Sequence, residues 1–300
     1  MDILQLRYFQ AVARSEHMSR AAEEIGITQP SLSKVIHRLE HEIGVPLFDR
    51  QGRSIRLNRF GRVFLEYVET VLRALDEGQR QVRDLAGIDG GEVLLAAAAL
   101  HWFPELLHRF RIQHPSVHFQ LFQRPLAEMV DRLETGACDF CFQSIPLIKA
   151  GIEWQPLLTE DIFLVVSSAH QLAKRKQIPL SAVAEEAVVI EQVGNGLRDL
   201  VDHFCHQAGF TPRIVCEVDE PAALFEFVKV DIGVAFAPAL MEKQIAAYGL
   251  KALRLTNPKC QRTFGMARYQ KSYLSQAART FQEFVTTYFA EIRNQRALKL

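Results

Sequence analysis

Hydrophobic and small residues recur at helical spacing in two short segments near the amino terminus, which predicts a helix-turn-helix over residues 18–42. The first helix is expected over Arg20 to Ile25, with Ser19 as its capping residue. Its small pair Ala21-Ala22 lies where a second helix must cross closely. Gly26 then permits a sharp exit, because glycine adopts backbone conformations that a β-carbon penalises.

The second helix begins after Thr28 and Gln29, whose side chains can cap it, and Pro30 is tolerated in its first turn. Its buried face carries aliphatic residues three or four positions apart: Leu32, Ile36, Leu39 and Ile43. Its other face carries short hydrogen-bonding and cationic groups: Gln29, Ser31, Ser33, Lys34, His37 and Arg38. A helix that lies in the major groove of DNA presents such groups to base edges and phosphates.

Two further elements complete a winged helix-turn-helix. An earlier helix has an apolar face: Leu4, Leu6, Phe9, Val12 and Ala13. After the second helix, residues 47–50 and 53–57 flank Gln51-Gly52, a pattern typical of a β-hairpin.

Arginines place a local positive excess on and beside this wing: Arg50, Arg53, Arg56 and Arg59. The chain as a whole has a formal net charge of +0. Any attraction to phosphate groups is therefore local to this part of the chain.

A single long helix is expected over Arg59 to Leu85. Seven positions follow each other along it by alternating steps of four and three: Phe64, Val68, Val71, Leu75, Gly78, Val82 and Leu85. All of them carry an apolar side chain except Gly78, which has none. We call these seven positions the seam. A lone helix with such a seam implies a partner helix, and the alternative is that it packs on its own domain. Gly87 to Gly91 then break the helix and mark a domain boundary.

From Val93 onward, strands and helices alternate, which is typical of α/β proteins with parallel or mixed sheets. Strands are expected over residues 93–99, 117–122, 139–143, 162–167, 187–190, 214–218 and 232–238. Helices are expected over residues 103–113, 126–135, 197–208 and 275–294. The fold class is therefore α/β, preceded by an all-α-plus-wing domain and a long linker helix.

Composition and chemistry exclude several classes of protein. A hydrophobic content of 48% and a charged content of 23% are ordinary for a soluble globular protein, and no apolar run is long enough to span a bilayer. Cys138-x-x-Cys141 has redox or zinc spacing, but no second pair matches it. His203, Cys205 and His206 make a poor ligand cluster on one helix, and no residue carries an activation motif. We therefore expect no enzyme, no metal and no cofactor.

The ordered motifs of the first sixty residues resemble the LysR-type transcriptional regulators. The similarity is carried by Leu6 to Phe9, Ser19 to Ala22, Thr28 to Ser33, Leu39-Glu40, Gly44 to Arg50, Arg56 to Asn58, and Gly61. The alternative for such a motif is a winged helix used for protein contacts. The resemblance implies a regulator in the bacterial cytosol, associated with the nucleoid, and five cysteines without framework spacing also favour a reduced cytoplasm.

The resemblance continues through Phe103 to Phe110, His114-Pro115, Gly136 to Asp139, Ile162 to Val166 and Gly233 to Pro238. It implies a DNA-binding domain over 1–58, a linker and dimerisation helix over 59–88, and an effector-binding domain over 89–300 that is similar to periplasmic binding proteins. That last domain is expected to have two subdomains, about 91–161 with 267–300 and about 162–266, with crossovers near 159–162 and 264–268 and a ligand cleft between them.

Candidate DNA-contacting residues follow from the helix-turn-helix and the wing: Ser19, Thr28, Gln29, Pro30, Ser31, Ser33, Lys34, His37, Arg38, Arg50, Arg53 and Arg56. We expect a dimer through the linker helix and further assembly to a tetramer. Because the symmetry of the protein is mirrored in its site, double-stranded DNA with an interrupted palindromic operator is the expected partner. RNA polymerase is a further partner if the protein is an activator.

Loops at strand ends and helix starts are expected to line the cleft. The candidate effector-binding residues are Ala98, Ala99, Leu100, His101, Gln143, Ser144, Asn195, Gly196, Leu197, Phe236 and Pro238. The free N–H groups of the helix after Gly196 favour an acid group, with Arg198 as a charge partner.

The chain departs from the resembling family after its first α/β strand, where many relatives have a Ser or Thr that binds the acid group of the ligand. Here residues 96–102 run Ala-Ala-Ala-Ala-Leu-His-Trp, which removes the hydroxyl donors. The expected effector is a small organic molecule, a carboxylate or aromatic metabolite with an apolar body, or the pocket is partly filled by Trp102.

Two other classes of function remain as alternatives. One is a metabolite-binding protein or enzyme that carries the winged helix as an appendage, which turnover of a metabolite would support. The other is an architectural DNA-binding protein without an effector, which a closed or plugged cleft would favour.

Overall fold

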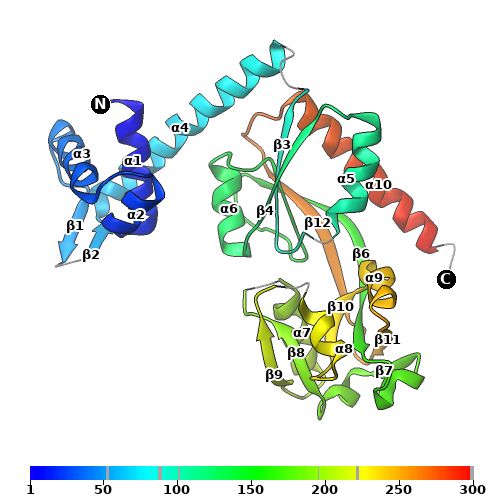
Figure 1. Ribbon diagram of the computed structural model, residues 1–300. Coiled ribbons are helices and arrows are strands. Elements are labelled where there is room, and N and C mark those ends of the chain that lie inside the picture. The colour runs from blue at the N-terminus through cyan, green and yellow to red at the C-terminus, as the bar shows by residue number, and fades with distance from the viewer. Residues whose placement is uncertain (52–53, 87–89, 101, 195, 221–222, 298–300) are drawn as a thin grey trace. The chain divides into compact units, whose positions relative to one another are not determined.

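The computed structural model describes residues 1–51, 54–86, 90–100, 102–194, 196–220 and 223–297. The chain divides into two compact units, Met1–Val82 and Arg83–Leu300. The first unit holds α1 (Ile3–Ser15), α2 (Met18–Glu24), α3 (Gln29–Ile43), β1 (Phe48–Gln51), β2 (Ser54–Leu57) and most of α4 (Arg59–Leu85) (Figure 1).

Helix α1 begins where Asp2 and Gln5 form a capping box, in which each side chain accepts a hydrogen bond from the backbone N–H of the other at 2.8 Å. Its apolar face encloses Phe9, which is fully buried between the other helices and the wing. The prediction for Leu4 is wrong, because this side chain is 56% exposed and Gln5 is buried in its place.

Helices α2 and α3 form the predicted helix-turn-helix. The predicted cap of α2 is wrong: the helix begins at Met18, and the ring of His17 accepts the backbone N–H of Arg20 at 3.2 Å, so Ser19 lies within the first turn. Gly26 has a φ of 71°, the left-handed conformation that its place after α2 requires. Thr28 caps α3 as predicted, through the N–H of Ser31.

The wing and the start of α4 are tied to α3 by polar side chains. Strands β1 and β2 pair antiparallel as the hairpin pattern predicted. The carboxylate of Glu40 on α3 accepts the backbone N–H groups of Leu47 and Phe48 at 2.8 and 3.3 Å. The buried side chain of Asn58 caps α4, since its Oδ1 accepts the N–H groups of Phe60 and Gly61, each at 2.9 Å.

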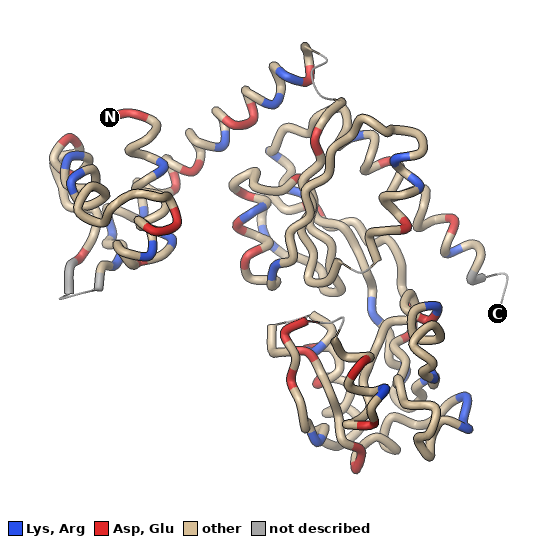
Figure 2. The backbone as a smooth tube through the Cα atoms, in the orientation of Figure 1, with Lys and Arg blue, Asp and Glu red and all other residues tan. Residues whose placement is uncertain are grey.

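Helix α4 has the predicted bounds, but its seam divides between two environments. Phe64 and Val68 pack into the core of the first unit, so these two positions follow the alternative of packing on the chain's own domain. Val71, Val82 and Leu85 are exposed, and so is Tyr67, at 68%. Charges of both signs follow each other along the helix (Figure 2). The exposed apolar part of α4 has no partner among the described residues of this chain.

The second unit is built on a large mixed sheet with strand order β4-β3-β5-β12-β6-β11-β7, in which β10 also pairs with β6, and on a separate parallel pair, β8 and β9. Strand β12 pairs antiparallel with both β5 and β6. The first half of its elements is β3 (Glu92–Ala97), α5 (Phe103–Gln113), β4 (His118–Gln123), α6 (Leu126–Glu134), β5 (Phe140–Gln143) and β6 (Ile152–Val166). The rest are β7 (Gln177–Pro179), β8 (Ala187–Glu191), α7 (Gly196–Gln207), β9 (Arg213–Val218), α8 (Leu224–Lys229), β10 (Ala235–Pro238), α9 (Glu242–Ala247), β11 (Lys251–Thr256), β12 (Gln261–Tyr269) and α10 (Gln276–Ala297), with short 3-10 turns at Gln171–Lys174, Leu180–Val183 and Ala239–Met241.

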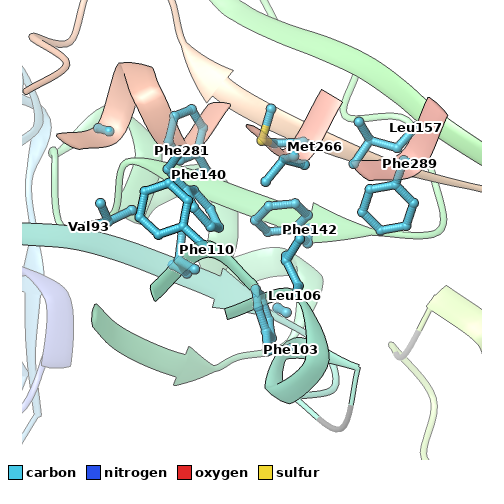
Figure 3. Packing of buried hydrophobic residues seen from close by; sticks show 14 of the residues in the cluster. Val93, Phe103, Leu106, Phe110, Phe140, Phe142, Leu157, Met266, Phe281 and Phe289 are labelled. Atoms are coloured by element: carbon cyan, nitrogen blue, oxygen red, sulfur yellow. The ribbon is translucent and has the colours of Figure 1, made fainter. Parts of the chain in front are cut away.

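Alternating side chains of β3 and β5 contribute to two separate cores. On β5, Phe140 and Phe142 point to the core under α5 and α10, whereas Cys141 points to the core under α6. Figure 3 shows the first of these cores, where phenylalanines from β5, α5 and α10 pack face to edge. This aromatic core fixes the strand ends from which the site is built.

Strands β6 and β12 are the largest departure from the sequence prediction. Only residues 162–167 were expected as a strand, yet β6 runs over fifteen residues, and β12 was not predicted. The amino-terminal part of β6 pairs with β12, and its last residues, from Ile162, also pair with β10 and β11. We call the part of the second unit around β3, β4 and β5 the first half and the part around β8, β10 and β11 the second half. No helix among the described residues is long and apolar enough to cross a membrane.

Candidate functional site

The exposed surface of α3 carries most of the residues expected to meet DNA. Gln29, Ser31, Lys34, His37 and Arg38 are exposed, as the helical pattern predicted. The remaining expected residues of the two helices also lie near or on the surface: Ser19, Thr28 and Pro30 are exposed, and Ser33 is half-buried.

Hydrogen bonds already hold part of this surface in place. The hydroxyl groups of Thr28 and Ser31 lie 2.8 Å apart at the start of α3. The guanidinium of Arg38 donates to Glu42 at 3.1 Å, an exposed pair that contributes little to stability and can exchange for a phosphate. On the wing, Arg56 is exposed and lies opposite Asp49 in the hairpin. Arg53 and the side chain of Arg50 lie outside the described part of the chain.

The second unit encloses a pocket between its two halves. Eight of the effector-binding residues expected from the sequence line it: Ala98, Ala99, Gln143, Ser144, Gly196, Leu197, Phe236 and Pro238. His101 and Asn195 lie outside the described residues. The prediction for Leu100 is not matched by the lining, because this side chain packs against the aromatic core of the first half.

Several lining residues were not named as candidates. Arg262 stands on the unpredicted strand β12, and Glu191 ends β8. The position of Glu191, a charged residue directly after the apolar run of β8, could have indicated from the sequence that it lines the cleft. The apolar remainder of the lining is Trp102, Leu126, Phe142, Leu224, Phe225, Ala237, Met241 and Phe264.

Trp102 forms one wall of this pocket. Its ring stacks on Phe103 with 3.7 Å between centroids and lies 4.9 and 4.7 Å from the rings of Phe142 and Phe264. The space left between the lining side chains is about 50 Å³, enough for a few water molecules and too small for an organic molecule with a ring. An effector must therefore separate the walls of the pocket or displace a side chain.

The cation of the pocket is already neutralised. Arg262 donates to one carboxylate oxygen of Glu160 through Nε at 2.9 Å and Nη2 at 2.8 Å, and to the hydroxyl of Ser144 through Nη1 at 2.7 Å. The other oxygen of Glu160 accepts the backbone N–H of Leu240 at 2.6 Å. Because the Glu160 side chain is fully buried, this pair and its hydrogen bonds form a fixed polar bridge behind the pocket.

Arg198 does not meet the expectation of a free charge partner. Its guanidinium donates to Asp202 at 2.7 Å, to Glu217 at 2.6 Å and to the backbone carbonyl of Glu191 at 2.9 Å. It does not appear among the residues that line the pocket. Its role is to hold the end of β8 against β9 and α7.

Two buried polar atoms of the pocket have no partner. Glu191 is 6% exposed, and neither its Oε2 nor the Nε2 of Gln143 has a hydrogen-bond partner within the described structure. Burial raises the pKa of Glu191 to about 7, although the positive charge of Arg262 lowers it. This shift corresponds to about 3 kcal/mol, whereas the positive end of a helix such as α7 contributes roughly 0.3–1 kcal/mol to an anion. The burial of the Glu191 carboxyl is therefore a larger effect than the one expected of the α7 helix end.

Replacing Glu191 with glutamine should remove a pH-dependent loss of stability. The raised pKa means that the folded state holds its proton more tightly than the unfolded state, so wild-type stability falls as pH rises from about 4.5 to 7 and levels off above that. Between pH 5 and pH 8 this group alone should cost about 2 kcal/mol. Urea unfolding of Glu191→Gln at both pH values should show that the loss is absent. The exposed Glu185, changed to Gln, is the matched control; if it removes as much of the loss as Glu191→Gln does, the assignment to Glu191 fails.

The pair of cysteines on and beside β5 offers no site. The sulfur atoms of Cys138 and Cys141 lie 3.4 Å apart as free thiols, and burial raises the pKa of Cys141 well above its usual range. A thiol of this kind is a poor nucleophile and a poor metal ligand. Across the described ranges, no three His, Cys, Asp or Glu side chains are grouped to hold a metal ion.

Comparison with known proteins places both units. Residues 3–62 match the model of the bacterial regulatory helix-turn-helix protein, lysR family, and residues 90–290 match the LysR substrate binding domain. The chain is 36% identical to the HTH-type transcriptional regulator YybE of Bacillus subtilis (strain 168), over 97% of this chain and 100% of that one. It is 29% identical to the transcriptional dual regulator GltC of the same organism, over 97% and 99% of the two chains.

Solved structures are similar as well. The effector binding domain of QuiR in complex with shikimate is 28% identical, covers 67% of this chain and 98% of its own, and has a TM-score of 0.59. Full-length CbnR complexed with its target DNA is 24% identical, covers 95% and 99%, and has a TM-score of 0.63, a likeness of fold.

Proposed function

We propose, since this chain belongs to the LysR family of transcriptional regulators, that α3 and the wing bind operator DNA and that the pocket of the second unit binds its effector. Members of this family are DNA-binding regulators with a substrate-binding domain, and they are not enzymes. The observation that carries the proposal is that one chain holds both an α3 surface of exposed donors and a pocket lined by both halves of the second unit.

We propose that the donors of α3 and the wing divide into groups that read bases and groups that bind phosphates. Gln29 can pair with the edge of adenine through both amide atoms, and Ser31 and Ser33 can adapt to several bases. Lys34, Arg38, Arg50 and Arg56 are proposed to meet phosphates, which position the protein without specifying sequence. His37, Ser19 and Thr28 are proposed to support these contacts, and so are Pro30 and Arg53.

Replacing Gln29 with alanine should relax base preference at one operator position by roughly 1–3 kcal/mol, the value of one good bidentate contact. Replacing Lys34 with alanine should instead weaken all sequences alike and reduce the salt dependence of binding by about one counterion. Selection of bound sequences from a randomised half-site measures the first effect, and salt titration measures the second. Unchanged base preference in both Gln29→Ala and Ser33→Ala would place the recognition helix elsewhere.

Assembly follows from the exposed apolar stretch of α4. We propose a dimer through this helix over about 59–88, further assembly to a tetramer through the effector domains, and an interrupted palindromic operator. The proposed limits of the DNA-binding domain, 1–58, and of the effector domain, 89–300, remain as the sequence indicated. We further propose action in the bacterial cytoplasm, where the chromosome lies, and contact with RNA polymerase when the protein activates.

The effector site is proposed at the lined pocket, together with His101 and Asn195. A ligand shifts the arrangement of the protein on DNA only if it prefers one closure of the pocket over another. Because the closed pocket leaves about 50 Å³, we propose that the ligand selects a more open arrangement. DNA binding must then change ligand affinity by the same factor that ligand changes DNA affinity.

A metabolite screen by thermal shift tests this proposal. A hit at 100-fold over its dissociation constant should add about 2.7 kcal/mol, and it should alter the DNase footprint. Gly196 lines the pocket, and a β-carbon there would already lie 3.5 Å from Ile145, so Gly196→Trp should fill the space and abolish both effects. Ile148→Trp, on an exposed side chain outside the lining, is the control.

The closed pocket also favours one alternative, a DNA-binding protein of this family that works without an effector. That alternative predicts that no metabolite produces a thermal shift, and that Gly196→Trp leaves operator binding and footprint as in the wild type.

A further inference from the structure

The charges around the pocket do not balance. Among the described lining residues, the charged side chains are Glu191 and Arg262. Arg262 is neutralised by Glu160, which is fully buried and holds it through two nitrogen atoms. Glu191 has no such counterpart among the described residues, so the described lining contains one uncommitted acid and no uncommitted cation.

Two buried polar atoms without a partner belong to residues that line the pocket. Oε2 of Glu191 comes from β8 in the second half and Nε2 of Gln143 from β5 in the first half, and neither has a hydrogen-bond partner in the described part of the chain. Buried polar groups in folded proteins are almost always hydrogen-bonded, because leaving one unpaired costs its full desolvation. An unpaired acceptor and an unpaired donor on two residues that line one pocket indicate a ligand that supplies both counterparts.

Aromatic rings make up much of the rest of the wall: Trp102, Phe142, Phe225, Phe236 and Phe264. The faces of such rings attract cations, and tryptophan does so most strongly. Arg262 already uses this property, since its guanidinium lies 5.5 Å from the centre of the Phe264 ring. Rings together with one free acid form a suitable environment for an organic cation.

We infer that the effector is a small amine, whose ammonium group binds the Glu191 carboxylate and whose apolar body lies against the aromatic wall. Gln143 donates to an oxygen atom on the same molecule. This inference rests on the proposed role of the pocket and replaces the acid group expected from the sequence. A carboxylate would have to compete with Glu160 for Arg262 while lying beside the like charge of Glu191.

The pH dependence follows from the groups that face Glu191. Burial raises the pKa of its carboxyl to about 7, and Arg262 of β12 opposes that rise. Two ion-pair groups among the described residues lie close by: Arg198 of α7 binds Asp202 and Glu217, and Glu160 of β6 binds Arg262. An amine that stays protonated should therefore bind about tenfold more tightly at pH 8 than at pH 6, as Glu191 ionises. An acid should show the opposite trend.

Calorimetry with three probes that share one ring tests the inference on the full-length protein: benzylamine, benzyl alcohol and benzoate. We expect benzylamine to bind at least tenfold more tightly than benzoate at pH 8, with benzyl alcohol between them. Glu191→Gln, which keeps the shape and loses the charge, should remove both the preference and the pH dependence. Glu185→Gln, the same change on an exposed side chain, should retain both.

Other outcomes overturn the inference. These are benzoate or shikimate binding more tightly than benzylamine, benzylamine binding that Glu191→Gln leaves intact, and no benzylamine binding at millimolar concentration. The wild-type pH profile alone, flat or falling toward pH 8 for benzylamine, would overturn it without any variant. Failure here is distinct from failure of the proposed function: an acid that binds and is excluded by Gly196→Trp leaves the pocket as the effector site and rejects only the amine.

Discussion

Replacing Gly61 with alanine is expected to destabilise the DNA-binding unit by about 3 kcal/mol or more. A β-carbon at this position would overlap the backbone oxygen of Leu47 and lie 2.8 Å from Cδ1 of Leu57. The Leu47 oxygen cannot move aside, because it accepts the backbone N–H of Asn58 at 3.0 Å. The first turn of α4 would have to shift away from the wing, and the cap that Asn58 provides would be lost with it.

Chemical denaturation of the full-length protein, followed by operator binding, measures this effect. Gly78→Ala is a matched control on the same helix, since a β-carbon there meets nothing within 4 Å of this chain. That change should stabilise α4 by roughly 0.5–1 kcal/mol, the usual advantage of alanine over glycine in a helix. Equal effects of the two substitutions would show that the close approach of α4 to the wing does not exist in solution.

Replacing Val71 with aspartate should dissociate the dimer and weaken operator binding by about 100- to 10,000-fold. Val71 is 51% exposed in the single chain, so the aspartate is tolerated in the monomer. In the dimer it would place a charge inside an apolar helix pair, where desolvation without a counterion is severely unfavourable. Once one subunit of a dimer binds its half-site, the second subunit is held at a high effective concentration near the other half-site. Dissociation of the dimer removes this gain in affinity.

Sedimentation velocity gives the assembly state, and a gel-shift titration on the full operator and on a single half-site gives the two affinities. Thr70→Asp, one position outside the seam and exposed, introduces the same charge and should leave both unchanged. The half-site affinity should be the same in wild type and Val71→Asp. Wild-type sedimentation of Val71→Asp would move the dimer interface away from α4.

Local signals were sufficient to predict the helix-turn-helix. Thr28, Pro30 and Gly26 each fix a backbone feature within a few residues of themselves, and the structure has all three as expected. The error at Ser19 arose because the neighbouring His17 can also cap a helix, through its ring nitrogen. Capping choices between neighbouring polar residues depend on the exact start of the helix, which sequence patterns place only approximately.

Long-range pairing could not be predicted in the same way. Strand β6 contains polar residues such as Thr159 and Glu160 in the middle of its length, so its alternation does not stand out. Arg262 and Glu160 are 102 positions apart, and only the pairing of β12 with β6 brings them together. The lack of a cationic partner for Glu191 is likewise a property of the assembled pocket. It arises because Arg262 pairs with Glu160 rather than with Glu191.

The pairing of β6 with β12 determines where segments of this protein can be exchanged with those of a relative. Thr159 leaves the first half of the sheet beside Thr263, which returns to it, and their hydroxyl groups lie 3.0 Å apart. The chain between them therefore enters and leaves at a single point, as an inserted cassette does. Transplanting residues 160–262 from a relative joins only two adjacent strands. Such an exchange should replace, as one piece, the lining residues between them, Glu191 and Arg262 included, while the lining from residues 98–144 stays that of this protein.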